Sequence, residues 1–172
     1  FTCTSSLSEI PANSLTVPRF SMWPFFKDQE NEIKSRGSQC INSYSQSRYI
    51  ADLQNYVMDL GELTPRTWTN LHEIPEEGPF VLKGETNSKK GYWNTMMFAS
   101  NKKEAIEVHG RLCADSLIGE QNIYIRQYVP LITYAKGIGG IPITKEFRFF
   151  VMYGHVIYGS YYWSNYVDEL PD

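Results

Sequence analysis

The sequence predicts an α+β fold in which a mostly antiparallel sheet carries flanking helices. From Phe80 onward, apolar runs and their periodicity follow the order strand, glycine-containing loop, helix, strand and hairpin. Aromatic residues make up 15% of the chain and crowd between Tyr124 and Tyr166, as is typical of a sheet-forming region. A length of 172 residues is enough for one compact domain or for two small lobes.

The N-terminal part, residues 15–78, is predicted to be a small α/β segment behind a tail. Residues 1–14 are rich in Ser and Thr and show no periodicity, so we expect them to be disordered or loosely packed. A short strand is expected over 15–17, a helix that begins with proline over 24–36, and a second short strand over 39–41.

The clearest helix is predicted over residues 46–60. Its apolar residues recur at helical spacing: Ile50, Leu53, Val57 and Leu60. Gly61 follows at the position where a left-handed C-terminal cap is favoured. The chain then returns in extended form over 64–68.

The C-terminal segment, residues 79–172, contains most of the predicted sheet. Its expected elements are a strand over 80–83, a loop over 84–92, a helix over 102–116, a strand over 123–129, an irregular glycine-rich crossing over 130–142, and two strands over 144–153 and 155–162. The last two strands meet at Tyr153-Gly154, which is typical of a hairpin.

Composition excludes several classes of function. The net charge is −3 with no long basic run, which argues against nucleic-acid binding by phosphate neutralisation. No stretch reaches the roughly 18 apolar residues that span a bilayer. Three widely spaced cysteines form neither a metal pair nor a redox pair and favour a reducing, cytoplasmic compartment. The three histidines are isolated, and the motifs of serine hydrolases, zinc proteases, Rossmann folds and P-loops are absent from the sequence.

The sharpest local motif is Lys83-Gly84 at the end of a predicted strand. The glycine lets backbone approach a ligand, and the loop that follows contains Lys89 and Lys90. Three ammonium groups around a mobile loop suit a polyphosphate. A solvated strand end with a basic turn is the alternative interpretation of the same residues.

Two further strands contain candidate ligand contacts. Strand alternation places Glu146 and Arg148 on one face, where opposite charges on an apolar strand either pair or meet a charged ligand such as phosphate. The alternative is an exposed sheet face. The strand over 123–129 ends at Pro130, leaving backbone groups that an adenine ring reads, although an ordinary core strand has the same appearance.

Taken in order, these strings resemble the ATP-grasp superfamily, so that the expected fold is ATP-grasp-like. The resemblance is closer to the phage and bacterial branch named for one arginine and two lysines, and it runs from about residue 17 to residue 163. The matching strings are Val17-Pro18-Arg19-Phe20, Asn42-Ser43-Tyr44, Leu63-Thr64-Pro65-Arg66-Thr67-Trp68, Lys83-Gly84-Glu85-Thr86-Asn87-Ser88-Lys89-Lys90, Trp93-Asn94, Met97-Phe98-Ala99 and Pro142-Ile143-Thr144-Lys145-Glu146-Phe147-Arg148.

The resemblance implies roles around the phosphates of ATP. Lys83 is expected to contact the α- and β-phosphates, and Lys90, together with Lys89, to close over them from the loop. Arg148 is expected to hold the γ-phosphate and the acyl-phosphate transition state. Glu146 would orient Arg148 or touch a metal ion.

The resemblance also implies an adenine site and a reaction. The Arg126 carbonyl and the Val129 amide would read the adenine edge, with a side-chain contact from Gln127. The family joins a carboxylate to an amine through an acyl phosphate, using ATP and Mg²⁺. The partners would be a small-molecule or peptide carboxylate and an amine, with residues 15–78 as the segment that precedes the nucleotide-binding part.

One departure from the family puts turnover in doubt. The family carries its main Mg²⁺ ligands on later strands, an Asp and then Glu-x-Asn, and the sequence stops before such a pair, with Asp168 and Glu169 as poor substitutes. We therefore assign no metal ligands and expect a truncated ATP-grasp segment from a longer chain. A non-catalytic nucleotide-binding or scaffold module is the alternative. A lysyl adenylate on Lys83 is a third, although the usual Lys-x-Asp-Gly string is missing.

Overall fold

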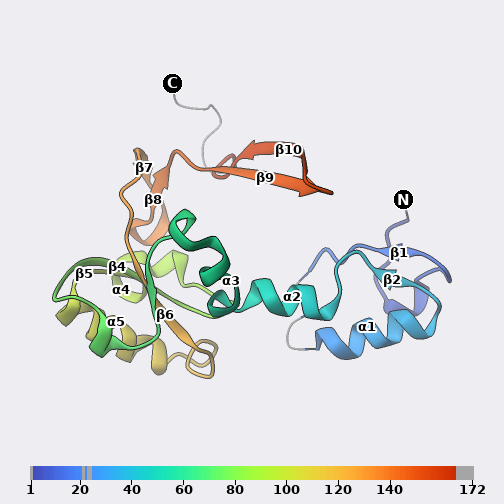
Figure 1. Cartoon of the computed structure of the whole chain (residues 1–172), viewed down its shortest axis with the longest axis horizontal. Coiled ribbons are helices and arrows are strands. Elements are labelled where there is room, and N and C mark those ends of the chain that lie inside the picture. Colours follow the sequence, from blue (N-terminus) through green and yellow to red (C-terminus); the bar gives the residue numbers. More distant parts are fainter. Residues whose placement is uncertain (1, 21, 23–24, 166–172) are drawn as a thin grey trace. The chain divides into compact units, whose positions relative to one another are not determined.

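The computed structural model describes residues 2–20, 22 and 25–165 and has the mixed α+β composition that the sequence predicts. The chain divides into two compact units, Phe1–Asp59 and Leu60–Asp172. Sheets are mainly antiparallel, and helices flank them (Figure 1). Within the described residues, no helix combines the length and the apolar character needed to cross a membrane.

The first unit is built from short elements around a small core. They are η1 (Leu7–Glu9), β1 (Leu15–Thr16), α1 (Phe26–Ser35), β2 (Gln39–Cys40), α2 (Tyr44–Ala51) and α3 (Leu53–Leu60), of which α3 ends at the first residue of the second unit. Strands β1 and β2 pair in parallel. Met22, Phe26 and Ile33 form the buried core.

Residues 2–14, which the sequence predicts to be loosely packed, are docked on this unit. The Ser14 amide donates to Ser38 Oγ at 3.1 Å, and Ser38 Oγ donates to the Pro11 carbonyl at 2.8 Å. Leu7 and Ile10 pack against the core of the unit. The prediction missed this because isolated side chains of residues 2–14 contact residues distant in sequence, and such contacts leave no periodic pattern.

The predicted helix over 46–60 is two helices. α2 begins two residues earlier, at Tyr44, because the Ser43 and Gln46 side chains form a capping box. Asp52 then takes an extended conformation, and its Oδ1 accepts from the Gln54 amide at 3.1 Å, as an N-cap of a second helix does. Gly61 has φ +51°, the left-handed conformation that the sequence predicts for the end of this segment.

The second unit holds the main sheet. Its remaining elements are η2 (Gly61–Leu63), β3 (Thr67–Trp68), η3 (Leu71–Glu73), β4 (Glu77–Gly84), η4 (Lys90–Tyr92), α4 (Trp93–Met96), β5 (Phe98–Asn101), α5 (Lys102–Cys113), β6 (Ile123–Gln127), β7 (Thr133–Lys136), η5 (Ile138–Gly140), β8 (Pro142–Thr144), β9 (Phe147–Met152) and β10 (His155–Tyr161). Four of the strands form an antiparallel sheet in the order β3-β6-β4-β5.

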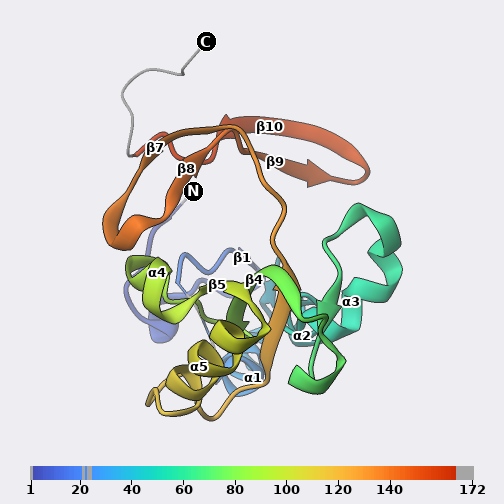
Figure 2. The same ribbon diagram turned by 90° about the vertical axis from the view of Figure 1, so that its left-hand side faces the viewer.

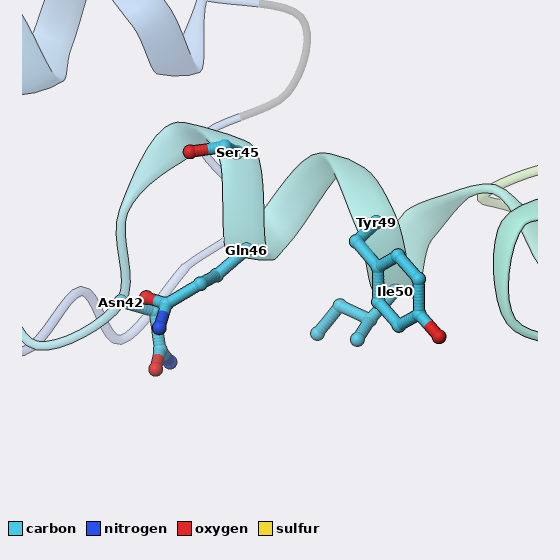
Figure 3. Close-up of a pocket in the computed structure, with 5 residues that line it drawn as sticks. All are labelled: Asn42, Ser45, Gln46, Tyr49 and Ile50. Atoms are coloured by element: carbon cyan, nitrogen blue, oxygen red, sulfur yellow. The ribbon is translucent and has the colours of Figure 1, made fainter. Parts of the chain in front are cut away.

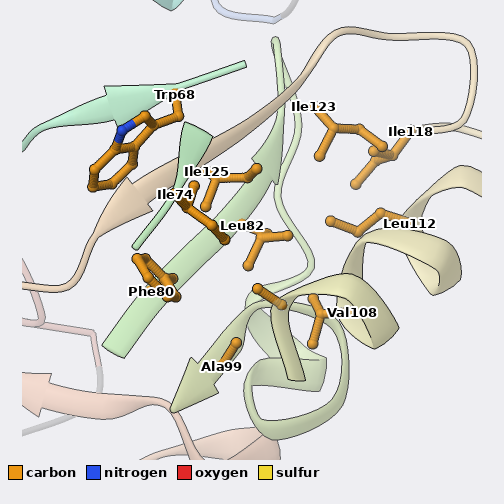
Figure 4. Close-up of a cluster of buried hydrophobic side chains, with 11 residues drawn as sticks. Trp68, Ile74, Phe80, Leu82, Ala99, Val108, Leu112, Ile118, Ile123 and Ile125 are labelled. Carbon is orange, nitrogen blue, oxygen red and sulfur yellow. The ribbon is translucent and has the colours of Figure 1, made fainter. Parts of the chain in front are cut away.

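Helix α5 covers one face of this sheet. Phe80 and Leu82 of β4 pack there with Val108 and Leu112 of α5 in a cluster whose members are almost completely buried (Figure 4). The same cluster includes Trp68 and Ile74. These two residues explain why the boundary between the units lies at 59/60 and not at the predicted 78/79, because β3 and the segment after it complete the sheet and its core.

The glycine-rich crossing over 130–142 is less irregular than predicted, because it contains β7, which pairs with β8. In both ribbon views β7 and β8 lie on the side of the sheet away from α5 (Figure 1, Figure 2). A second buried cluster forms there from Ile141, Ile143, Tyr161 and Trp163. The predicted hairpin is present as β9 and β10.

Candidate functional site

The candidate site lies on the sheet face that α5 does not cover. In the antiparallel register Lys83 is opposite Tyr124, and Arg126 is opposite Val81. Paired residues share a face and successive residues alternate, so Lys83 and Arg126 lie on the same face, opposite to the core residue Leu82. The fold thus places an ammonium and a guanidinium side by side on two central strands.

Lys83 carries its charge in an unfavourable environment. Burial lowers the pKa of its ammonium, and the positive charges of Arg126 and Lys90 lower it further. Among residues 2–20, 22 and 25–165, no carboxylate or hydrogen-bond acceptor pairs with Lys83. A perturbed lysine among other cations is a feature of sites that bind anions or activate an amine.

Arg126 is fixed by its side chain and by its backbone. Its Nη2 donates to Thr64 Oγ1 at 2.6 Å, which ties the guanidinium to the segment before β3. Its peptide group lies inside the sheet, between Thr67 of β3 and Val81 of β4. The Arg126 backbone, whose carbonyl is expected to bind the adenine edge, is therefore already part of two strand ladders.

Gly84 has a packing role that differs from the predicted one. A Cβ atom at this position would lie 2.7 Å from Gln121 Oε1 and 3.0 Å from Ile118 Cγ2. Gly84 is therefore required because the protein's own side chains fill the space beside it. The sequence analysis expected the missing side chain to make room for a ligand. In the structure, protein atoms lie there instead.

The loop after Gly84, predicted to be mobile, is tied to the turn that follows α5. Gln121 Oε1 accepts from the Thr86 amide at 3.1 Å, and Gln121 Nε2 donates to Asn87 Oδ1 at 3.1 Å. Lys89 Nζ lies 2.6 Å from Asp115 Oδ2. The hydrogen bond from Lys89 is the main cause of the lowered pKa of the Asp115 carboxyl. Lys89 is thus engaged in a structural ion pair.

Lys90, the next residue, contacts the aromatic residues that follow β10. Its Nζ lies 4.7 Å from the centroid of the Tyr162 ring and 5.5 Å from that of Trp163, and it donates to the Tyr162 hydroxyl. Arg148 Cζ lies 4.6 Å from the centroid of the same Tyr162 ring. The Arg148 distance is in the range of a cation–π contact, whereas the hydrogen bond places the Lys90 ammonium at the hydroxyl end of the ring, so Tyr162 contacts both predicted phosphate-binding cations.

Glu146 lies where the predicted strand over 144–153 is interrupted, between β8 and β9. Its Oε2 accepts from Trp163 Nε1 at 2.8 Å and from the hydroxyl of Thr144. Within the described part of the chain, no ion pair joins Glu146 to Arg148. Among the described residues, Glu146 is bonded to Trp163, the neighbour of Tyr162, and not to Arg148.

Two glycines of η5 position the segment that carries Lys90. Gly139 has φ +68°, and a Cβ atom there would lie 2.0 Å from the Gly91 carbonyl oxygen. A Cβ atom at Gly140 would lie 2.1 Å from Asn94 Nδ2. Glycine at these positions permits η5 to pack directly against η4 and α4, which fixes Lys90 beside the second cluster.

Gln127 and Val129 do not join the cations. Gln127 pairs with Phe80 and alternates with Arg126, so its side chain lies on the face opposite to Lys83. There it lines a small pocket of about 150 Å³ with Trp68, Glu77 and Phe80. Val129 follows β6 and is 47% exposed. Its amide has no acceptor within residues 25–165 and is thus open to a ligand.

A second hollow, of about 440 Å³, lies on the first unit. Asn42, Ser45, Gln46, Tyr49 and Ile50 line it (Figure 3). All five come from α2 and the residue before its cap, and they include no charged side chain. This hollow has no group that would bind or activate a charged substrate.

The described residues do not form a metal centre. Across 2–20, 22 and 25–165, no three His, Cys, Asp or Glu side chains gather as metal ligands do. Asp168 and Glu169 lie outside the described residues. The described residues therefore do not fit Mg²⁺ as a protein-held ion.

Tyr162 and Trp163 are the site residues that the sequence motifs did not include. Tyr162 is the last residue of the predicted hairpin and Trp163 follows it, in a region where aromatic residues are so frequent that none of them stands out. Comparison with known proteins does not supply the missing signal: no family model, no curated protein and no solved structure matches this chain.

Proposed function

We propose that the second unit binds ATP through its phosphates, as the nucleotide-binding segment of an ATP-grasp-like carboxylate–amine ligase that works in the cytoplasm. The observation that carries the proposal is the Lys83 ammonium, which is partly buried, close to Arg126 and Lys90, and without a carboxylate partner among the described residues. An anion with several charges stabilises such a group where the protein does not.

The cations are assigned to different phosphates of ATP. Lys83, from the centre of the sheet, is assigned to the inner phosphates. Lys90 and Arg148, held on the Tyr162 ring, are assigned to the outer phosphate. Lys89 is not assigned to ATP, because its ion pair with Asp115 occupies it. The sequence motif thus contributes one loop lysine instead of two.

The proposed reaction transfers the terminal phosphoryl group and then forms an amide. A carboxylate oxygen attacks the γ-phosphorus, the bond to the β–γ bridging oxygen breaks, and ADP leaves with that electron pair. An amine then attacks the acyl carbon, inorganic phosphate leaves, and the amine loses a proton. Arg148 and Lys90 stabilise the charge that develops on the transferred phosphoryl oxygens.

The second candidate is a nucleotide-binding module without catalysis. It is favoured by the attachment of the loop 85–89 to Gln121 and Asp115, since a loop that is fixed in this way does not close over a substrate. The same cations would bind ATP, but no acyl phosphate would form.

Titration calorimetry with ATP tests binding. We expect a dissociation constant between micromolar and millimolar, roughly −8 to −4 kcal/mol, and at least ~10-fold weaker binding by Lys83→Ala, or about 1.4 kcal/mol. Lys103→Ala is the matched control, because Lys103 is an exposed lysine of α5. Absence of ATP binding by the folded wild type contradicts both candidates.

Hydroxylamine trapping separates the ligase from the module. Hydroxylamine attacks an acyl phosphate and yields a stable hydroxamate, so that the amine substrate need not be known. With ATP, Mg²⁺ and a panel of amino acids and short peptides, hydroxamate formation supports the ligase. ATP binding without hydroxamate favours the module, and transfer of label from α-labelled ATP to Lys83 would instead identify a lysyl adenylate.

A further inference from the structure

We propose that Tyr162 is a positioning residue, whose ring holds Lys90 and Arg148 together so that both reach one polyphosphate anion. This inference rests on the proposed function and adds to it a residue outside the motifs that suggested ATP binding. Lys90 comes from η4 and Arg148 from β9, two elements that are distant in sequence. Tyr162 is the group that contacts both of them.

The contacts are of two kinds, one with the ring and one with its hydroxyl. Arg148 Cζ is 4.6 Å and Lys90 Nζ is 4.7 Å from the centroid of the Tyr162 ring. Lys90 also donates to the Tyr162 hydroxyl. The negative potential of the ring face attracts the Arg148 guanidinium, and the hydroxyl oxygen accepts from the Lys90 ammonium. One side chain can therefore keep two groups close that would otherwise repel each other.

The ring itself is held in place by its surroundings. The Tyr162 amide donates to the Glu146 carbonyl at 2.9 Å. The neighbours on each side are buried and bonded to the same junction: the Tyr161 hydroxyl donates to the Thr144 carbonyl at 3.0 Å, and Trp163 Nε1 donates to Glu146 Oε2 at 2.8 Å. The Tyr162 and Trp163 rings meet edge to face, with centroids 4.9 Å apart.

An aromatic ring suits this task better than a carboxylate. A carboxylate between Lys90 and Arg148 would neutralise them and would repel an incoming phosphate. Tyr162 keeps the two cations close while leaving their charge uncompensated. Glu146 is the carboxylate nearest in sequence to Arg148, and its Oε2 accepts hydrogen bonds from Trp163 and Thr144. The acidic residue thus fixes the ring segment, and the ring positions the cations.

The first readout is the side-chain NMR spectrum of Lys90 and Arg148 without any ligand. We expect ring-current shifts of the Arg148 and Lys90 side-chain protons in the wild type, loss of the Lys90 shift alone in Tyr162→Phe, and loss of both shifts in Tyr162→Leu. Tyr162→Met serves as a second variant without the ring if the leucine variant does not fold. Absence of these shifts in the wild type would overturn the proposal.

The second readout is the affinity for inorganic tripolyphosphate and for ATP. We expect about a 5- to 10-fold loss for both anions in Tyr162→Leu, as for the loss of a cation–π contact and a charged hydrogen bond, and partial recovery in Tyr162→Phe, which restores the ring but not the hydroxyl. Tyr134→Leu is the matched control, because Tyr134 packs on the same cluster and contacts neither cation. It should leave both affinities unchanged.

The two anions separate this inference from the function on which it rests. If tripolyphosphate binding depends on the ring while ATP does not bind, the proposed function fails and the positioning role stands. If ATP binds to the wild type and the variants without the ring bind it equally well, the positioning role is overturned and the proposed function stands. If neither anion binds, both are overturned.

Discussion

The Lys89 ammonium lies 2.6 Å from the Asp115 carboxylate, and this ion pair fastens the loop after β4 to the turn after α5. The adjacent Lys90 instead contacts Tyr162. Two neighbouring residues of the same type are thus assigned different tasks, one to the fold and one to the candidate anion site.

This division predicts opposite outcomes for two alanine variants. Lys89→Ala should lower the free energy of unfolding, because its ion pair with Asp115 is largely shielded from solvent, and should change ATP affinity by less than about 2-fold, because Lys89 is not assigned to the ligand. Lys90→Ala should weaken ATP binding about 10-fold or more, as for a lost charged hydrogen bond. Urea denaturation and calorimetry on both variants check this. Weaker ATP binding in Lys89→Ala than in Lys90→Ala would show that the assignment is reversed.

Lys83→Met should stabilise the protein in the absence of ATP. The substitution keeps an unbranched chain of similar length and removes a desolvated charge that lies near Arg126 and Lys90. We expect a gain of about 1 kcal/mol in unfolding free energy together with a loss of ATP binding. Urea denaturation with and without ATP measures both. A destabilised variant would mean that Lys83 has a favourable structural role.

The lowered pKa of Lys83 predicts a pH dependence of stability. Between this lowered pKa and the ordinary lysine value of about 10.4, the unfolded chain binds more protons than the folded chain. Stability from this group therefore rises with pH across that window and is lost as the pH falls through it. The stability difference between Lys83→Met and the wild type should accordingly shrink as the pH rises toward the ordinary lysine value, as followed by urea denaturation at each pH. A difference that is constant with pH would contradict the lowered pKa.

The same property predicts selective labelling by pyridoxal phosphate. This reagent joins an aldehyde to a phosphate, so the cations attract it and the unprotonated fraction of Lys83 attacks its carbonyl carbon, with loss of water to give an imine. Borohydride then reduces the imine to a stable amine. Peptide mass spectrometry should find Lys83 labelled ahead of the exposed Lys103, with ATP protecting Lys83 alone. Equal labelling of the two lysines would argue against an anion site at Lys83.

Much of the fold follows from local patterns. Periodicity located α5 and β6 to within a few residues, and the Tyr153-Gly154 turn located the hairpin of β9 and β10. The sequence analysis did not predict the helix break at Asp52, because the apolar spacing continues across it. The bond from the Gln54 amide to the Asp52 side chain identifies Asp52 as a new N-cap. Strand β7 was not predicted because the segment around it is rich in glycine, which is typical of a loop.

The candidate site is a harder case. Strand alternation is enough to place Lys83 and Arg126 on one face, but it does not reveal that the face toward Gly84 is filled by Gln121 and Ile118. Lys89 and Lys90 are neighbours of the same residue type, so the sequence does not distinguish their roles. Their contacts in the structure do, because Lys89 pairs with Asp115 and Lys90 contacts Tyr162. These contacts join segments that are distant in sequence.

The close approach of Gly139 to Gly91 predicts that the position of Lys90 depends on a glycine far from it in sequence. Gly139→Ala would place a Cβ atom 2.0 Å from the Gly91 carbonyl oxygen in a residue with φ +68°, so that η5 has to move away from η4. We expect a loss of about 2–4 kcal/mol in unfolding free energy and weaker ATP binding by the folded fraction, as measured by urea denaturation and calorimetry.

Gly154→Ala provides the matched control for this last prediction. Gly154 has φ +80° in the turn of the β9–β10 hairpin, and a Cβ atom there meets no atom within 4 Å. The variant therefore carries the backbone strain of a left-handed alanine, about 1 kcal/mol, without the steric contact, and it should bind ATP as the wild type does. Because strain is common to both variants, any additional loss of ATP affinity in Gly139→Ala measures the displacement of η4 and Lys90. Equal behaviour of the two variants would mean that packing of η5 on η4 does not position Lys90.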